Sequence, residues 1–124
     1  MNKVTYFEIP ADDMEQAENF YSKAFGWEIN KLGDGYTRII SCATTNNGVS
    51  SSEAGAINGG IQKRGDRAKA PTVVITADNF DETAAKIESL GGKIVIPKDD
   101  MGGMGWYGQF DDPAGNRIGL FQAN

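Results

Sequence analysis

The chain has 124 residues, with 17 acidic and 12 basic side chains and a formal net charge of -5. This length suits one domain and is too short for two ordinary independent domains, and the acidic balance disfavours nucleic acid as a partner. No stretch approaches the roughly 20 apolar residues that a membrane span needs, so no membrane partner is expected.

The first residues, MNKVTYFEIP, lack the pattern of a secretory signal peptide, and we therefore expect a soluble, cytoplasmic protein. The single cysteine, Cys42, cannot form an internal disulfide, and its apolar neighbours predict a buried, unreactive thiol. The sequence contains no histidine that could activate this thiol as a nucleophile.

Two stretches of the sequence follow the same plan. Residues 4–29 predict a strand, an acidic cap, a helix and a second strand, and residues 72–96 repeat this order. We expect the helices to begin at the N-caps Asp13 and Asp78 and to end at the left-handed glycines Gly26 and Gly91. The sequence therefore indicates a duplicated module.

Apolar side chains recur at helical spacing in both predicted helices, and this spacing predicts the faces that pack on a sheet. The residues are Met14, Ala17, Tyr21, Ala24 and Phe25 in the first helix, and Phe80, Ala84, Ile87 and Leu90 in the second.

Further strands are expected after each helix, so that each half has the order strand, helix, strand, strand, strand. Their approximate ranges are 27–31, 36–42 and 56–62 in the first half, and 93–97, 104–111 and 116–122 in the second. The predicted class is α+β. One domain, residues 1–124, would contain a βαβββ module at 1–62, the connector KRGDRAKAP at 63–71, and a second module at 72–124.

Three segments, DDMEQAENFYSKAFGW, ITADNFDETAAKIESLGGKIV and DDPAGNRIGLFQ, resemble the vicinal oxygen chelate superfamily. This superfamily includes glyoxalase I, extradiol dioxygenases, and the fosfomycin- and bleomycin-resistance proteins. The resemblance covers essentially the whole chain, and its details point to a glyoxalase-like branch. It implies two modules whose bent sheets form an open barrel-like cavity, with the helices outside.

The resemblance also implies where metal-using members carry their ligands. The first-strand position of each module falls on Tyr6 and Thr72, and the last-strand glutamate falls on Gly119. The remaining position lies in NGGIQ, residues 58–62, whose register the sequence does not fix. None of these residues is a strong metal ligand, so Gly119 is interpreted as a vacated metal position, and no metal and no other cofactor are expected.

The absence of histidine independently excludes the ligand sets that extradiol dioxygenases and fosfomycin-resistance enzymes need. Glyoxalase I needs a metal to polarise its substrate, so metal-dependent glyoxalase activity is not expected either.

Side chains on the concave face follow from strand alternation, because residues two apart point the same way. Val4 and Thr76 would lie on this face, whereas Val73 would pack under the second helix. The predicted ligand-binding residues are Tyr6, Glu8, Thr72, Val74, Tyr107, Gln109, Arg117, Gly119 and Phe121. A few polar groups in an apolar concavity are typical of a small-molecule site.

Glu8 is the sharpest candidate for chemistry, because a buried carboxyl away from cations could act as a general base or hold a cationic ligand. Alternatively, Glu8 pairs with Arg117 or a lysine and only satisfies the interior. Tyr6 and Tyr107 are either proton donors or packed aromatic side chains whose hydroxyls are satisfied.

Two functions follow. The first is a metal-independent protein that binds a small molecule, comparable to bleomycin-resistance proteins. The second is a metal-independent enzyme acting on a small oxygenated substrate, with Glu8, Tyr6 and Tyr107 as catalytic residues. An interaction module with a vestigial pocket is a third class. The resemblance further implies a homodimer.

Overall fold

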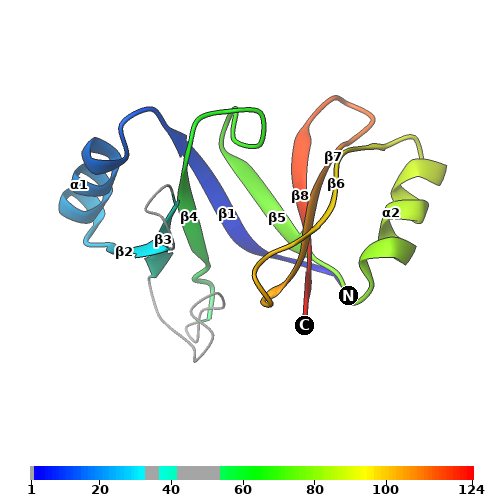
Figure 1. Cartoon of the computed structure of the whole chain (residues 1–124), viewed down its shortest axis with the longest axis horizontal. Helices are drawn as coiled ribbons and strands as arrows, with labels where there is room; N and C mark the ends of the chain where they lie inside the picture. Colours follow the sequence, from blue (N-terminus) through cyan, green and yellow to red (C-terminus); the bar gives the residue numbers. More distant parts are fainter. Residues whose placement is uncertain (1, 33–36, 42–53) are drawn as a thin grey trace. The chain divides into compact units, whose positions relative to one another are not determined.

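The computed structural model describes residues 2–32, 37–41 and 54–124, with only the backbone at 32 and 37–41. Within these residues the chain forms two helices and eight strands (Figure 1). Their order is β1 (Lys3–Ala11), α1 (Met14–Phe25), β2 (Glu28–Leu32), β3 (Thr37–Ser41), β4 (Asn58–Lys63), β5 (Thr72–Thr76), α2 (Phe80–Ser89), β6 (Lys93–Asp100), β7 (Gly105–Asp111) and β8 (Arg117–Ala123). The α+β class and the repeated βαβββ order are confirmed. The prediction for Cys42 lies outside the described residues.

The chain divides into two compact units. One is Thr5–Pro71, and the other combines Met1–Val4 with Thr72–Asn124. We call them module 1 and module 2 and describe each by itself. The predicted single domain and the predicted cavity that joins the modules stay predictions.

In module 1 the strands are hydrogen-bonded in the order β2-β3-β4-β1, and β1 runs parallel to β4 (Figure 1). Helix α1 packs on one face of this sheet. The core on that face contains the buried Ala11 and Ile61. Partly buried apolar residues complete it, namely Phe7, Met14, Ala17, Tyr21, Trp27 and Ile29. This confirms the predicted packing of Met14, Ala17 and Tyr21.

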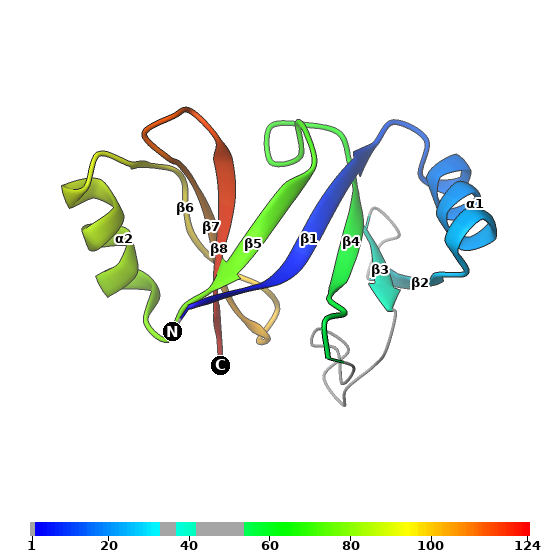
Figure 2. The ribbon, with the colours of Figure 1, turned by 180° about the vertical axis from the view of Figure 1, so that it is seen from behind.

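In module 2 the order is β5-β8-β7-β6, and β5 runs parallel to β8 (Figure 2). Helix α2 packs on one face of this sheet. The core on that face is formed by Ala77, Phe80, Phe110 and Leu120, with Ala84, Ile87, Ile94, Trp106 and Ile118 packed against it. Each module therefore has one sheet face covered by its helix. We call the opposite face the helix-free face.

The helix ends agree with the sequence analysis at three of four positions. Asp13 caps α1 by accepting a hydrogen bond from the backbone N–H of Gln16, and Gly26 ends this helix with φ of 71°. Gly91, just after α2, has φ of 97°. The fourth prediction, Asp78 as the N-cap of α2, is wrong, because Asn79 accepts from the backbone N–H of Glu82 at 2.9 Å.

Four apolar residues lie differently from their predicted positions. Phe25 is 62% exposed and Leu90 is 72% exposed, so the apolar face that each helix packs against its sheet is narrower than predicted. Val73, expected under α2, is 42% exposed, and Val4, expected on the concave face, is 44% exposed. Alternation gives the side of the sheet on which a residue lies but does not show whether a neighbour covers it.

The turn between β7 and β8 is held by one carboxylate. Asp112 Oδ1 accepts from the backbone N–H groups of Ala114 and Asn116, both at 2.9 Å, and Gly115 adopts φ of 84°. These hydrogen bonds, with one from the Asn116 side chain, lower the pKa of Asp112. The turn fixes the register of β7 and β8, which the site of module 2 requires.

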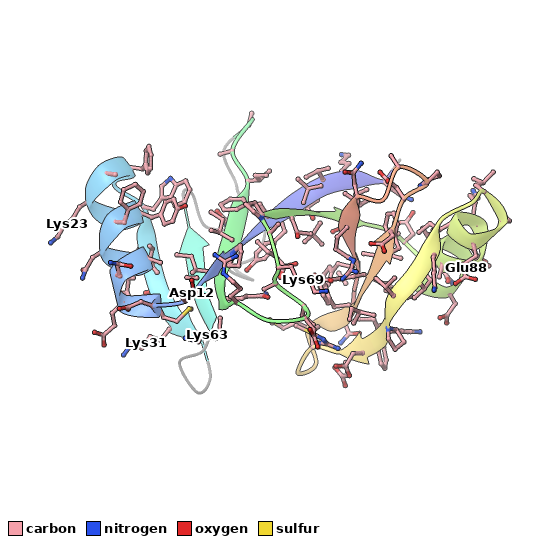
Figure 3. All side chains as sticks on the ribbon, turned by 90° about the horizontal axis from the view of Figure 1, so that it is seen from above. Asp12, Lys23, Lys31, Lys63, Lys69 and Glu88 are labelled. Carbon is pink, nitrogen blue, oxygen red and sulfur yellow. The ribbon has the colours of Figure 1, made fainter. Side chains whose placement is uncertain are left out.

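Contacts at the end of β4 tie it to the segment that follows β1. The ammonium group of Lys63 donates to the backbone carbonyl of Asp12, and the two residues lie together in Figure 3. Arg64 Nε donates to the Asp12 carboxylate at 3.1 Å. The last strand of module 1 is therefore anchored beside its first strand.

Candidate functional site

The helix-free face of module 1 is polar. Tyr6 pairs with Asn58, and Glu8 pairs with Gly60, along the parallel strands β1 and β4. Because Phe7 and Ile61 point to α1, these four residues and Gln62 lie on the opposite face. Pairing thus fixes the register at residues 58–62, which the sequence left open.

The side chain of Glu8 places a carboxylate on this face, and the residue is only 5% exposed. Gln62 Nε2 donates a hydrogen bond to Glu8 Oε2. An amide donor stabilises a buried carboxylate without adding a positive charge. The hydrogen bond from Gln62 therefore offsets part of the cost of burying the Glu8 carboxylate. Glu8 is thus buried, and the amide of Gln62 is one of its hydrogen-bond partners.

Tyr6 lies two residues before Glu8 on the same strand and is half-buried. Burial raises the pKa of the Tyr6 phenol above its usual range, and the negative charge of Glu8 raises it further. Tyr6 is therefore held in its neutral form, in which the hydroxyl can donate a hydrogen bond.

The helix-free face of module 2 is built around β8. Gly119 pairs with Val74 on one side and with Gln109 on the other, and Phe121 pairs with Tyr107. Thr72, Val74, Tyr107 and Gln109 are all less than 9% exposed. The predicted residues of this module therefore share one face of one sheet.

A chain of hydrogen bonds crosses this face. Gln109 Nε2 donates to Tyr107 Oη at 2.8 Å, and Arg117 Nη1 donates to Gln109 Oε1 at 3.4 Å. At the other end, Arg117 Nε donates to Asp111 Oδ1 at 2.7 Å, which is also a salt bridge. The four side chains form one connected set, which we call the β7–β8 relay.

The space beside Gly119 is occupied by side chains of the neighbouring strands. A Cβ at Gly119 would stand 2.9 Å from Val74 Cγ2 and 3.0 Å from Tyr107 Oη. The Tyr107 ring reaches this space from β7. The missing side chain on β8 therefore makes room for a phenol from the next strand.

The residues at the positions of the implied metal ligands do not fit a metal ion. Tyr6 is held neutral, Thr72 offers a hydroxyl, and Gly119 offers no side chain. On β4 the three residues of this face are Asn58, Gly60 and Gln62. Over residues 2–32, 37–41 and 54–124, no group of three or more His, Cys, Asp or Glu side chains could hold a metal ion. Neutral oxygen and amide donors alone bind divalent metals weakly, so no step of a mechanism is routed through a metal.

Three residues of these faces were missed by the sequence analysis. Asn58, fully buried opposite Tyr6, and Gln62, the partner of Glu8, lie on a strand whose register the sequence did not fix. Asp111, the partner of Arg117, was not considered. Its position two residues after Gln109 on the same strand was the signal that could have identified it.

The proposed catalytic and binding residues are divided between the modules. Tyr6 and Glu8 belong to module 1, whereas Thr72, Val74, Tyr107, Gln109, Arg117, Gly119 and Phe121 belong to module 2. The single cavity that would contain all of them stays a prediction. In the described part of the chain, no helix has the length and apolar character to cross a membrane.

Two βαβββ modules, each with its last strand parallel to its first, define the fold class of glyoxalase-type proteins. The chain belongs to the Glyoxalase/Bleomycin resistance protein/Dioxygenase superfamily, whose family model matches residues 3–120.

Two curated relatives and one solved structure illustrate this kinship. The putative glyoxylase CFP32 of Mycobacterium tuberculosis is 28% identical over 96% of this chain and 45% of its own length. The anthracycline biosynthesis protein DnrV of Streptomyces peucetius is 26% identical over 94% of this chain and 46% of its own length. The chain thus spans about half the length of these relatives. A methylmalonyl-CoA epimerase of Streptomyces coelicolor, in complex with 2-nitronate-propionyl-CoA, is 15% identical with a TM-score of 0.70, over 98% of this chain and 96% of that one. This likeness shows the fold alone.

Proposed function

We propose that this chain is a metal-independent member of its superfamily that binds a small molecule. The observation that carries the proposal is the environment of Gly119. There the phenol of Tyr107 and the buried amide of Gln109 fill the face on which metal-using members place a carboxylate. Neutral hydrogen-bonding groups beside apolar side chains suit an organic ligand.

In this proposal each helix-free face supplies groups that bind the ligand. Glu8, Tyr6 and Arg117 supply charge and hydrogen bonds, and Phe121 and Val74 supply apolar surface. The complex of the Streptomyces coelicolor epimerase with a small-molecule ligand supports the choice of an organic ligand, without indicating which ligand this chain binds. The proposed assembly is a homodimer. The proposed location is the cytoplasm, because disulfides are rare there and a chain with one cysteine cannot form an internal disulfide.

Native mass spectrometry of the purified, untagged protein tests this proposal, because one spectrum reports the oligomer mass, bound metal and any bound organic molecule. A dimer that carries a discrete organic adduct and no metal is the expected result. The sample is then treated with a chelator, incubated with Zn²⁺, Mn²⁺ or Mg²⁺, and measured again. Stoichiometric uptake of any of these ions would overturn metal independence.

A second candidate function is a metal-independent enzyme acting on a small oxygenated substrate. The observation in its favour is that Glu8, nine-tenths buried and hydrogen-bonded by an amide, lies two residues from the neutral phenol of Tyr6. A carboxylate base beside a neutral phenol can accept and donate the proton in acid–base catalysis. If an activity is found, Glu8→Gln removes the base and should abolish turnover while the ligand still binds. Turnover that persists in this variant would exclude Glu8 as the base.

A further inference from the structure

The segment that follows β4 is an ordered hairpin rather than a loose connector. Gly65 and Ala68 exchange two backbone hydrogen bonds, of 3.3 and 3.1 Å, and form an isolated antiparallel bridge. Ala68 is only 4% exposed, so one side of this turn is packed. The small loop is visible after β4 in Figure 1. We call residues 63–69 the basic hairpin, and its side chains start from fixed backbone positions.

The basic hairpin differs in charge from the rest of the chain. Four of the 12 basic side chains of the sequence lie in it, and all four are exposed, namely Lys63, Arg64, Arg67 and Lys69. At its tip, Asp66 and Arg67 have opposite charges. The whole chain has a net charge of -5, so the hairpin is basic in an otherwise acidic protein. A local excess of positive charge attracts anions.

The guanidinium group of Arg64 is held from two sides. Its Nε donates to the carboxylate of Asp12 at 3.1 Å, and its Nη1 donates to the backbone carbonyl of Lys69 at 3.0 Å. These bonds use two of the five N–H donors of a guanidinium group. The Arg64 side chain is 46% exposed, so the group is oriented and still reached by solvent. A group that is already oriented loses little freedom when it binds an oxyanion.

Two ammonium groups belong to the same cluster. Because the carbonyl of Lys69 contacts Arg64, the Lys69 side chain leaves the backbone beside the guanidinium group. Lys63 donates to the backbone carbonyl of Asp12, whose carboxylate binds Arg64 (Figure 3). The neighbouring Asp13 caps α1, where the helix dipole offsets its charge. Three cations thus lie around the Asp12 carboxylate, which leaves an excess of two positive charges.

We propose that the basic hairpin binds the phosphate group of a small molecule, through Arg64, Lys69 and Lys63. A phosphate monoester has a second pKa of about 6 and is a dianion at neutral pH, so its charge matches the excess of two positive charges. Its three terminal oxygens can accept from three cations, whereas a carboxylate has two oxygens and one charge.

The charge of the rest of the chain favours a small molecule over nucleic acid. An extended polyanion on the basic hairpin would also meet the acidic remainder of the protein, which repels it. A single phosphate group contacts the hairpin alone.

The proposed phosphate site lies at the end of the polar face of module 1. Arg64 follows Gln62, the partner of Glu8, by two residues, a distance of about 7 Å along an extended chain. The backbone N–H of Arg64 donates to the carbonyl of Ala11 at 2.9 Å, so the pairing of β4 with β1 continues to this residue. A phosphate ester can therefore place its phosphate on the hairpin and its organic part on the helix-free face. This extension rests on the proposed function, whereas phosphate binding itself does not.

Isothermal titration at low ionic strength tests the charge of the ligand with phenyl phosphate and phenyl sulfate. At about pH 7.5 we expect the phosphate dianion to bind more tightly than the sulfate monoanion by about tenfold. At about pH 5 phenyl phosphate is also a monoanion, and this preference should disappear. The sequence has no histidine that would titrate in this range. Equal affinities of the two probes at the higher pH would overturn the phosphate assignment.

Three substitutions locate the site. Arg64→Gln removes the oriented guanidinium group and should weaken phenyl phosphate binding by about tenfold. Lys69→Gln removes an ammonium group but keeps the backbone carbonyl that holds Arg64, and it should weaken binding by about threefold. The matched control is Lys93→Gln, which removes the same charge at the exposed start of β6 and should leave the affinity unchanged.

Thermal unfolding checks that each variant is folded, and Lys69→Gln tests the site even where Arg64→Gln fails to fold, because it keeps the contacts of Arg64. A loss of affinity in Lys93→Gln equal to that in Lys69→Gln would assign the effect to the net charge of the chain and overturn the site.

Two further probes distinguish the source of the phosphate. Tighter binding of phenyl phosphate than of inorganic phosphate would support a ligand that extends onto the helix-free face, and equal binding would overturn this extension. Tighter binding of a single-stranded DNA oligonucleotide than of phenyl phosphate, lost in Arg64→Gln, would overturn the choice of a small molecule. A metal in the native mass spectrum would overturn the proposed function and leave the phosphate site intact.

Discussion

The hydroxyl oxygen of Tyr107 lies 3.0 Å from the point where a Cβ on Gly119 would stand. Because Gly119 on β8 has no side chain, the Tyr107 side chain from β7 can occupy the space beside it. The pairing of Gln109 with Gly119 and of Tyr107 with Phe121 sets this arrangement.

Gly119→Ala is therefore expected to destabilise the protein. The added methyl would stand 2.9 Å from Val74 Cγ2 and must displace it or the Tyr107 ring, at a cost of about 1–3 kcal/mol. Chemical denaturation measures this cost. Gly65→Ala is the control, because its Cβ would meet nothing within 4 Å. Equal stability of the two variants would show that the space beside Gly119 is open.

Gln62→Glu should destabilise module 1 in a pH-dependent way. The variant replaces the donor to Glu8 with a second carboxylate, and the repulsion raises the pKa of one of the pair above its value in the unfolded chain. A raised pKa means that the folded state binds the proton more tightly, so the destabilisation is large at roughly pH 8 and shrinks toward roughly pH 5. Thermal unfolding across this range measures the effect.

The control for this variant exchanges the two residues. Glu8→Gln combined with Gln62→Glu restores one amide donor and one carboxylate acceptor in the opposite order. Its stability should vary with pH much less than that of Gln62→Glu alone. A double variant as pH-sensitive as the single one would contradict the pairing of Glu8 with Gln62.

Tyr6 should ionise at a higher pH in the folded protein than in the unfolded chain. Burial and the charge of Glu8 raise its pKa above the value in the unfolded chain, about 10. The stabilisation that this represents is fully present below that value and is lost as the pH rises through the folded-state pKa. Spectroscopic titration of tyrosinate should show a late step that Tyr6→Phe removes. In Glu8→Gln the step should move to lower pH, since one of its two causes is gone. A late step unchanged in Tyr6→Phe would assign it to another of the four tyrosines.

The corrected cap of α2 gives a direct test at neighbouring positions. Asn79→Ala removes the side chain that accepts from the backbone N–H of Glu82 and should cost about 1 kcal/mol. Asp78→Ala removes a residue before the cap and should change the free energy of unfolding by less than about 0.5 kcal/mol. Denaturation curves of both variants measure the difference. A larger loss of unfolding free energy in Asp78→Ala than in Asn79→Ala would identify Asp78 as the N-cap, as the sequence analysis predicted.

Much of the fold could be predicted because its signals are local. Asp13 followed by Gln16, the glycines after the helices, and apolar residues at helical or alternating spacing each act within a few residues. The error at Asp78 has the same origin, because Asp78 and Asn79 are both good caps and only the backbone decides between them. Leu90 and Val73 were misplaced because their exposure depends on which other segments cover them.

The candidate site was less predictable, because its contacts join residues far apart in the sequence. Alternation correctly placed Tyr107 and Gln109 on one face, but it could not show that Gln109 connects Tyr107 to Arg117. Nor could it show that Gln62, on a strand of unknown register, is the partner of Glu8. The absence of histidine, in contrast, could be read directly from the composition.

The parallel pairing of β4 with β1 has a consequence for the folding of module 1. Gln62 and Glu8 are 54 residues apart, so the hydrogen bond between them closes one of the longest loops in the module. Contacts of such high contact order form late, because the chain must first be brought together over that distance. During synthesis β1 leaves the ribosome well before β4, and until β4 arrives its edge is unpaired and its carboxylate is hydrated. We therefore expect the polar face of module 1 to form after the local contacts of its helix.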